Sequence, residues 1–340
     1  MLQRNNRNES VPIDRLTGII GTGPANGIIV AGPVFFSWSA QDADPWSDAG
    51  SGTLTGAVAV VHRRIPTVAC RAAVFRSLPA RSLKRIAMTH QDLALRLVEA
   101  RRQHRLVDGL RADDLPPDAA TAYAIQQAVL AGLDTSTGAW KIGARSPGGA
   151  AAGAPIPAPL VLASPARSAY GGFFRVLVEL EIAFRFAEPI APRGEAYARD
   201  EVLARVGTVL PAIEIVDSRF AEWPNVAPLA QLADAQNNGA LVTGHALPYA
   251  GFARQFDFVS PVLELTFDGI PLAADTTGNP AGDPRELLVW FVNHCAAMGI
   301  AIEPEWTITT GSYVGAHPLD RPGIVHGHID GLGEVEVELT

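Results

Sequence analysis

The sequence is poor in cysteine and has no long uninterrupted apolar run. Only Cys70 and Cys295 occur in 340 residues, and no C-x-x-C pair is present. These counts argue against a disulfide framework and a thiolate zinc site, and they fit a reducing cytoplasm. Glycine and proline interrupt the most apolar stretch, residues 19–36, so we predict neither a transmembrane helix nor a signal peptide there.

The sequence also has fewer basic than acidic residues. The chain has 27 Lys+Arg against 35 Asp+Glu, which gives a net charge of -8 at pH 7. This balance argues against nucleic acid or a membrane surface as the partner. An acidic protein that binds an anionic substrate usually needs a cation to do so, and a metal ion can supply it.

The charge is also unevenly distributed. Residues 1–87 carry ten Lys/Arg and five Asp/Glu, a local charge of +5, which leaves -13 for residues 88–340. The first part shows no helix or strand period, whereas a regular amphipathic pattern begins at Met88. We therefore expect residues 1–87 to be a disordered leader or to precede the true start. We expect one catalytic domain after them, with a helical part at 88–135 and a β-rich metal-binding body at 136–340.

Helices and short strands are predicted within that domain. The helices cover about 89–107, 118–131, 198–206 and 283–298, and strand-like runs cover 140–143, 175–186, 210–220, 241–247, 260–269 and 333–340. The Gly/Ala/Pro-rich segment 148–160 is predicted to be a loop, and Asn237 to Gly239 a turn. Strands dominate the second half without a βαβ alternation, so the pattern indicates an α+β fold with a mainly β body.

Two acidic residues interrupt the apolar run RVLVELEIAFRF at 175–186. Its β-branched and aromatic residues favour a strand, on which residues i and i+2 share a face. Glu179 and Glu181 would then stand roughly 6.5 Å apart, within reach of one shared partner. A half-solvated strand with a wet polar face is the alternative.

Glu214 repeats this pattern, because Ile213 and Ile215 flank it in a segment too apolar for a surface strand. Burying a lone carboxylate costs several kcal/mol, so three such acids need a cation or strong hydrogen-bond donors. Three carboxylates with open positions suit a hard divalent ion such as Mg²⁺ or Mn²⁺.

Lys141 is one of two lysines in a chain with 25 arginines, and no other lysine follows Met88. Flanked by Trp140 and Ile142 on a predicted strand, it is a candidate for a partly desolvated amine that gives or takes a proton. A surface lysine that extends its amine into solvent is the alternative.

Histidine offers two further candidates. His326 and His328, in HGHID, share a strand face, but no third ligand is close in sequence, which favours polar edge-strand residues over a metal site. His294 and Cys295 lie inside the helix predicted at 283–298 and are interpreted as core residues.

Several segments occur in a fixed order. They are AYAIQ at 122–126, WKIG at 140–143, VELEIAF at 178–184, PAIEIVDSRF at 211–220, LADAQNNGALVTG at 232–244, TTGS at 309–312 and GLGEVEVEL at 331–339. In this order and spacing the chain resembles the 2-keto-4-pentenoate hydratase branch of the fumarylacetoacetate hydrolase superfamily, which includes oxalocrotonate decarboxylases. The resemblance spans roughly residues 88–340.

The resemblance implies a mixed β-roll and a divalent metal, Mg²⁺ or Mn²⁺, held by Glu179, Glu181 and Glu214. It implies Lys141 as the catalytic residue of a hydratase (lyase) acting on a small 2-oxo or 2-hydroxy-dienoic acid, such as 2-keto-4-pentenoate, in aromatic catabolism. It also implies a homo-oligomer, or a complex with a related decarboxylase or hydratase. The substrate contacts implied by these motifs are Asp217, Asn237, Thr310 and Ser312.

Two departures from the family pattern leave the reaction open. Segment 146–160 contains no acidic residue, where hydratases of this type usually have one, and the usual D-N-x-S becomes D-A-Q-N at 234–237. Hydration is the expected reaction, with oxalocrotonate-type decarboxylation and C–C hydrolysis as alternatives. A non-catalytic homologue that binds a 2-oxo acid or serves as a partner subunit is the remaining alternative.

Overall fold

The computed structural model describes residues 80–273 and 277–340, with side chains from residue 91 onward. Helix α1 (Ala80–Gln103) opens this part of the chain. It begins and ends earlier than the predicted 89–107, and Met88 lies within it. The predicted leader falls largely outside the described residues, so the boundary at Met88 stays a prediction.

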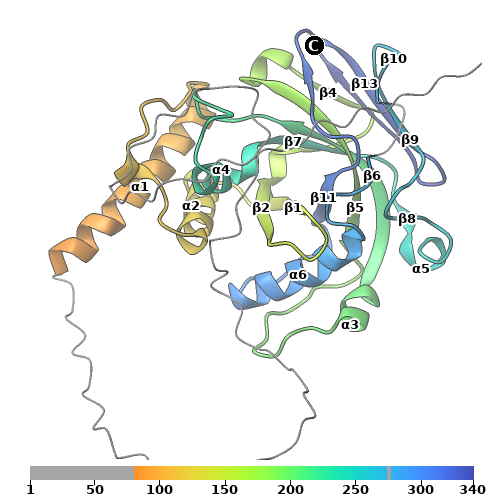
Figure 1. The fold of residues 1–340 in the computed structure, drawn as a ribbon, viewed down its shortest axis with the longest axis horizontal. Coiled ribbons are helices and arrows are strands. Elements are labelled where there is room, and N and C mark those ends of the chain that lie inside the picture. The colour runs from red at the N-terminus through yellow and green to blue at the C-terminus, as the bar shows by residue number, and fades with distance from the viewer. Residues whose placement is uncertain (1–79, 274–276) are drawn as a thin grey trace, which may run out of the picture. The chain divides into compact units, whose positions relative to one another are not determined.

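A small helical piece lies to one side of the sheets (Figure 1), where α2 (Ala119–Gly132) packs against α1 and against α4 (Pro228–Ala233). The Asp118 carboxylate caps α2 by accepting a hydrogen bond from Thr121 N at 2.8 Å, which satisfies a free amide of the first turn. The helices enclose a core of their own. Its buried members include Leu93, Leu97, Ile125, Val129 and Phe220.

Nine strands form the larger sheet. They are β1 Thr137–Ala144, β2 Ala151–Pro157, β3 Val161–Ala163, β5 Val176–Phe186, β6 Val206–Val216, β7 Asn238–Thr243, β8 Leu247–Pro248, β11 Thr307–Ser312 and β12 His317–Leu319. Their order is β2-β1-β11-β5-β6-β7-β3, with β12 paired to β5 and β8 to β6. The motif segments WKIG, TTGS, VELEIAF and PAIEIV therefore lie on four adjacent strands, β1, β11, β5 and β6 (Figure 1).

Five strands form the smaller sheet. They are β4 Ala166–Ser168, β9 Leu263–Phe267, β10 Ile270–Ala273, β13 Gly323–Ile329 and β14 Gly333–Leu339, in the order β10-β9-β13-β14-β4. The main core contains buried side chains of both sheets. The sheets approach closely at Gly327, where an added Cβ would lie 2.6 Å from Leu180 Cδ1. A larger residue between the two histidines of HGHID would therefore displace the buried Leu180 side chain.

Helix α6 (Pro284–Ala297) lies alongside β1, β2 and β11. The Asp283 carboxylate caps it by accepting a hydrogen bond from Arg285 N at 3.0 Å, and Phe291 packs against Trp140 with ring centroids 5.3 Å apart. The prediction of this helix is confirmed. The remaining helical elements are short. They are α3 Arg199–Leu203, α5 Tyr249–Phe252 and 3₁₀ turns at Ala112–Asp114, Ala158–Leu160, Tyr170–Gly172 and Ala235–Asn237.

Three local predictions were wrong. Most of the predicted loop 148–160 forms β2, which pairs with β1. β2 is an edge strand, where proline is tolerated. The turn expected at Asn237 to Gly239 lies earlier, at Ala235–Asn237, so that Asn238 and Gly239 already belong to β7. His326 and His328 lie on β13, the central strand of its sheet, and not on an edge. The α+β class with a mainly β body is confirmed.

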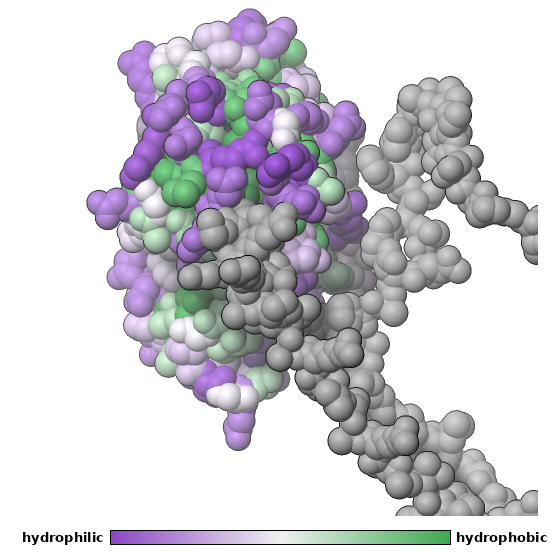
Figure 2. All heavy atoms as spheres, turned by 90° about the vertical axis from the view of Figure 1, so that its left-hand side faces the viewer, coloured by the Kyte–Doolittle hydropathy of each residue, from purple (hydrophilic) through white to green (hydrophobic). Residues whose placement is uncertain are grey.

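No helix among the described residues is long and apolar enough to cross a membrane. Figure 2 shows the side of the molecule that lies on the left in Figure 1. In its coloured part, hydrophilic residues alternate with smaller hydrophobic areas.

Candidate metal centre and active site

The two acids of β5 stand on the face away from the main core. Val178, Leu180 and Ile182 alternate with them and are fully buried in that core. Strand alternation therefore turns Glu179 and Glu181 to the opposite face, as the sequence predicted. Glu181 is only 1% exposed, which excludes the wet strand face considered as the alternative.

Register brings the third acid to the same place. Glu214 on β6 lies directly opposite Glu179 on β5, and it is completely buried. One carboxylate oxygen from each of Glu179, Glu181 and Glu214 lies within 4.8 Å of the other two. In the described part of the chain this is the one group of His, Cys, Asp or Glu side chains that meets so closely.

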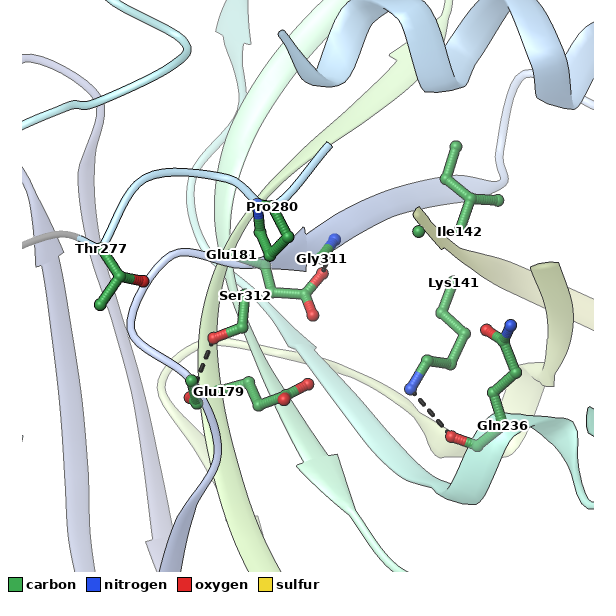
Figure 3. A pocket seen from close by; sticks show the side chains of 11 residues that line it. Lys141, Ile142, Glu179, Glu181, Gln236, Thr277, Pro280, Gly311 and Ser312 are labelled. Carbon is green, nitrogen blue, oxygen red and sulfur yellow. Dashed lines mark hydrogen bonds between the residues drawn. The ribbon is translucent and has the colours of Figure 1, made fainter. Parts of the chain in front are cut away.

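Lys141 reaches the cluster from β1. Its Nζ donates to Glu214 Oε1 at 2.6 Å and to the backbone carbonyl of Gln236 at 3.1 Å. Figure 3 shows the amine pointing into the space that Glu179 and Glu181 face. The interpretation of Lys141 as a surface lysine is wrong, because its side chain is only 15% exposed.

Backbone and side-chain donors orient the carboxylates. Glu181 Oε2 accepts from the Thr309 hydroxyl and from Gly311 N, the latter at 2.8 Å. Glu214 Oε1 accepts from Asn238 Nδ2 at 3.0 Å, whereas its buried Oε2 has no hydrogen-bond partner. An unpartnered buried carboxylate oxygen is costly, and a cation at this position would satisfy it.

The carboxylates destabilise one another when no cation is bound. Burial, followed by the charge of Glu214, raises the pKa of Glu179 to about 7. Burial, with Glu214 and Glu179, raises the pKa of Glu181 well above its usual value. Burial lowers the pKa of Lys141, but the three carboxylates outweigh it and leave that pKa above its usual value. One ammonium does not neutralise three carboxylates, and their hard oxygens fit a divalent cation.

A cavity of about 300 Å³ opens beside these groups. Besides Lys141, Glu179 and Glu181, its lining includes Ile142, Gln236, Thr277, Pro280 and Ser312. Figure 3 shows these side chains around one common space. A small molecule fits such a volume, between the carboxylate cluster and a wall that carries apolar and hydroxyl-bearing side chains.

The four predicted substrate contacts are divided by the structure. Ser312 lines the cavity, and Thr310, Asp217 and Asn237 do not. Thr310 points to the other face of β11, where its hydroxyl donates to the Ile182 carbonyl at 2.7 Å. The prediction that it faces the site was therefore wrong, because strand alternation gives that face to Thr309.

Asp217 and Asn237 lie outside the cavity for different reasons. Asp217 follows β6 and accepts from Arg175 N at 3.0 Å, in a separate hollow. The Asn237 amide turns away and donates to Gln231 Oε1 at 3.0 Å. A backbone with positive φ at three consecutive residues, Ala235 to Asn237, sets this direction and instead brings Gln236 to Lys141.

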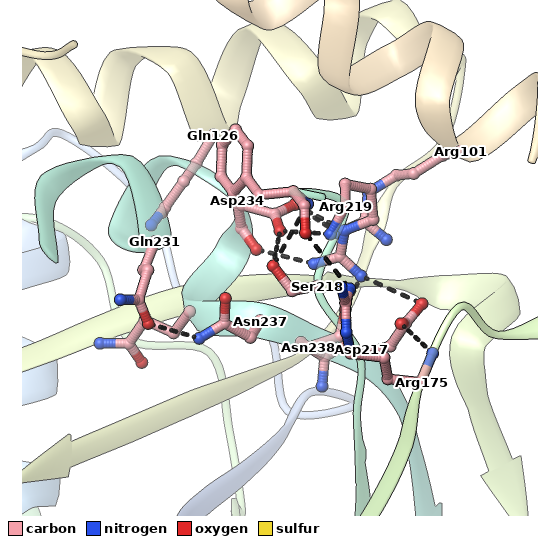
Figure 4. Close-up of polar contacts among 12 residues, drawn as sticks. Arg101, Gln126, Arg175, Asp217, Ser218, Arg219, Gln231, Asp234, Asn237 and Asn238 are labelled. Atoms are coloured by element: carbon pink, nitrogen blue, oxygen red, sulfur yellow. Dashed lines mark hydrogen bonds and ion pairs between the residues drawn. The ribbon is translucent and has the colours of Figure 1, made fainter. Parts of the chain in front are cut away.

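Arg219 holds this left-handed segment at both ends (Figure 4). Its guanidinium donates to Asp234 Oδ1 at 2.6 Å, to the Asp234 carbonyl at 2.8 Å and to the Asn238 carbonyl at 2.7 Å. The segment between them supplies the Gln236 carbonyl to Lys141, and Asn238 itself donates to Glu214. Arg219, although remote from the cavity, thus fixes two polar contacts of the site.

Four residues of the sequence motifs carry roles that the sequence did not predict. They are Arg219, Gln236, Asn238 and Thr309. The orientation of Thr309 toward the site follows from strand alternation along TTGS, which puts Thr309 on the same face as Gly311. The roles of Gln236 and Asn238 depend on a left-handed backbone without glycine, for which the sequence carries no clear signal.

We expect Arg219→Lys to lower catalytic activity by roughly tenfold while leaving divalent-metal affinity within about threefold, because it loosens the Gln236 segment and leaves Glu179 and Glu181 in place. Stability should also fall by about 2–3 kcal/mol, since charge-assisted hydrogen bonds are lost. Arg175→Lys is the control, because Arg175 donates to the carbonyls of Phe220 and Ala221 and not to this segment. Equal loss of kcat in both variants would show a general loss of folding.

The sequence was compared with those of known proteins. No protein-family model matches the chain. A 2-hydroxyhexa-2,4-dienoate hydratase of Comamonas testosteroni is 28% identical over 174 residues, 50% of this chain and 62% of that protein. A 2-keto-4-pentenoate hydratase of Burkholderia vietnamiensis (strain G4 / LMG 22486) is 26% identical over 267 residues, 73% of this chain and 97% of that protein.

A solved structure shares the fold. The 4-oxalocrotonate decarboxylase from Pseudomonas putida G7, complexed with magnesium and adipate, aligns with a TM-score of 0.64 over 75% of this chain and 98% of that chain, at 18% identity. The predicted β-roll architecture is therefore confirmed. The chain is thus similar in sequence to 2-hydroxy-dienoate hydratases and in fold to this decarboxylase, the two kinds of enzyme that its motifs predicted.

Proposed function

We propose that this protein is a divalent-metal-dependent hydratase that adds water to a small 2-hydroxy-dienoic acid of the 2-keto-4-pentenoate type. The observation that carries the proposal is the clustering of Glu179, Glu181 and Glu214 with Lys141. Lys141, Glu179 and Glu181 line a cavity of about 300 Å³. The similarity to two hydratases supports the same reaction class.

The three glutamates would hold the cation. Their oxygen-only donor set and the raised pKa values of Glu179 and Glu181 fit Mg²⁺ or Mn²⁺. When bound, the ion would act as a Lewis acid toward the carboxylate and 2-oxo oxygens of the substrate. Thr309 and Gly311 keep Glu181 oriented for this role, because both donate to the same carboxylate oxygen.

Lys141 supplies the proton chemistry. Its pKa lies above the usual value, so Nζ carries a proton at neutral pH and serves as an acid toward the carbon that becomes protonated when the dienol ketonises. Hydrogen bonds to Glu214 and to the Gln236 carbonyl fix the direction of the amine. Ile142 and Pro280 give the cavity an apolar surface on which the hydrocarbon part of the substrate would pack.

The charge of the cavity favours hydration over oxalocrotonate-type decarboxylation. Oxalocrotonate carries two carboxylates, and its distal one needs a cationic partner. Among the described residues that line the cavity, Lys141 is the only cation, and it is already paired with Glu214. A substrate with a single carboxylate therefore matches this lining better.

The test is turnover of 2-hydroxypenta-2,4-dienoate by the full chain, followed by loss of the ultraviolet absorbance of the conjugated dienol. We expect turnover with Mg²⁺ or Mn²⁺, formation of the hydrated 4-hydroxy-2-oxo acid, and loss of activity with a chelator. Release of CO₂ from oxalocrotonate without hydration would instead establish the decarboxylase. Binding of the dienoate without any turnover would establish the non-catalytic homologue.

The assembly belongs to the same proposal. We propose a homo-oligomer, or a complex with a related decarboxylase or hydratase, on the ground of the family resemblance of the sequence motifs. Light scattering coupled to size-exclusion chromatography measures the mass directly, and a monomeric mass for the active protein would exclude both assemblies.

A further inference from the structure

The solvent face of the smaller sheet carries the HGHID motif. On β13, the residues Val325, Gly327 and Ile329 are buried against the larger sheet. His326 and His328 alternate with them and point to the other side, where their side chains are 34% and 44% exposed. Two histidines at i and i+2 of a strand thus share an accessible face.

Cross-strand pairing supplies the third side chain that the sequence did not show. In register, His328 lies between Glu334 on β14 and Glu264 on β9, and His326 lies between Glu336 and Thr266. Residues directly opposite on neighbouring strands have Cβ atoms about 4.5–5.5 Å apart. Both imidazoles therefore lie within side-chain reach of carboxylates from adjacent strands.

One carboxylate lies between the two rings. Glu334 Oε2 is 3.7 Å from His326 Nε2, and Glu334 Oε1 is 3.7 Å from His328 Nδ1. Ligand atoms bound to one tetrahedral zinc ion are roughly 3.3 Å apart, since each bond is about 2.0–2.2 Å. The two 3.7 Å distances go to different oxygens of Glu334, and the three side chains do not meet within 4.8 Å of one another as they stand. A common ion therefore requires the exposed imidazole rings and the carboxylate to rotate toward one point.

We propose that His326, His328 and Glu334 form a second metal site, separate from the glutamate cluster, for a borderline transition cation of the Zn²⁺, Ni²⁺ or Cu²⁺ class. Imidazole nitrogens favour these ions, whereas oxygen-only sites favour Mg²⁺ or Mn²⁺. The two sites therefore differ in the metals they select. Glu264 and Glu336 beside the histidines add negative charge, which attracts the cation.

The site is tested on the full chain with excess Mg²⁺ present, which competes for the oxygen-only cluster. Isothermal titration with ZnCl₂ should show one bound equivalent fewer in the double variant His326→Gln/His328→Gln than in the wild type. Each single histidine variant should weaken Zn²⁺ binding by roughly tenfold or more, and Glu334→Gln by less, because an amide oxygen still ligates. His245→Gln is the control, since His245 is exposed and lies outside the cluster.

A spectroscopic readout separates this site from the glutamate cluster. The electron paramagnetic resonance spectrum of bound Cu²⁺ should show coupling to imidazole nitrogens in the wild type and in His245→Gln, and not in the double variant. Without metal, the variants should melt as the wild type does, because the positions are on the surface. A wild-type Cu²⁺ spectrum without nitrogen coupling, or an unchanged Zn²⁺ stoichiometry in the double variant, would overturn the proposal.

Discussion

Lys141→Met is expected to reduce turnover of the dienoate by about 10²–10⁴-fold, the usual scale for losing a general acid–base group. Metal affinity should stay near that of the wild type or rise, because an ammonium close to the site opposes a bound cation. Without Lys141, the buried Glu214 carboxylate keeps only the hydrogen bond from Asn238. The variant should therefore be less stable without a bound metal ion than with one. Turnover and Mn²⁺ affinity are measured side by side.

Lys141→Arg should not restore activity. A guanidinium does not lose its proton near neutral pH, and its planar donors do not reproduce the two contacts from Nζ to Glu214 and Gln236. Arg145→Met is the control for general charge, because Arg145 follows β1 and does not line the cavity. Full activity in Lys141→Arg would mean that Lys141 contributes only charge, and its role in proton transfer would have to be abandoned.

The second large effect concerns the carboxylates. Glu179→Gln, Glu181→Gln and Glu214→Gln should each weaken Mg²⁺ or Mn²⁺ binding by at least about 100-fold, since each removes a formal charge from a hard-cation site while nearly preserving shape. Calorimetric titration gives the affinities. Glu303→Gln, at an exposed position after α6, is the matched control. Unchanged metal affinity in all three variants would exclude the site.

The same variants should change the pH dependence of metal-free stability. The folded pKa of Glu179 is about 7, above its unfolded value, so the folded state binds more protons than the unfolded state between about pH 4.5 and 7. The free energy of unfolding should therefore fall as pH rises through this window, and added metal should reverse the loss. Glu179→Gln should flatten the profile and stabilise the metal-free protein near pH 7. Thermal melts across this window check both effects, and a profile unchanged by the substitution would contradict the assigned repulsion.

The sequence was sufficient for features that depend on near neighbours in the chain. The period of two along 175–186 fixes which side chains share a face, so the pairing of Glu179 with Glu181 follows from the order of the residues alone. The cap of α6 is equally local, because Asp283 needs only the amide of Arg285 to form it. The ordered motifs predicted the fold, which the solved decarboxylase structure confirms.

Tertiary structure decided what depends on distant segments. Pairing of β5 with β6 sets Glu214 against Glu179, and a shift of one residue would have turned Glu214 to the other face. Segment 148–160 has little strand propensity, and its pairing with β1 made most of it a strand.

The polar contacts around the site have the same origin. Local preference disfavours a left-handed backbone at residues other than glycine, yet Ala235, Gln236 and Asn237 adopt it. Hydrogen bonds from the buried Arg219 to Asp234 and Asn238 hold the two ends of this segment. His326 and His328 acquired a third neighbour, Glu334, only through strand register. Sequence patterns thus specified the side chains and their faces, whereas the free energy of packing two sheets determined which of those faces meet.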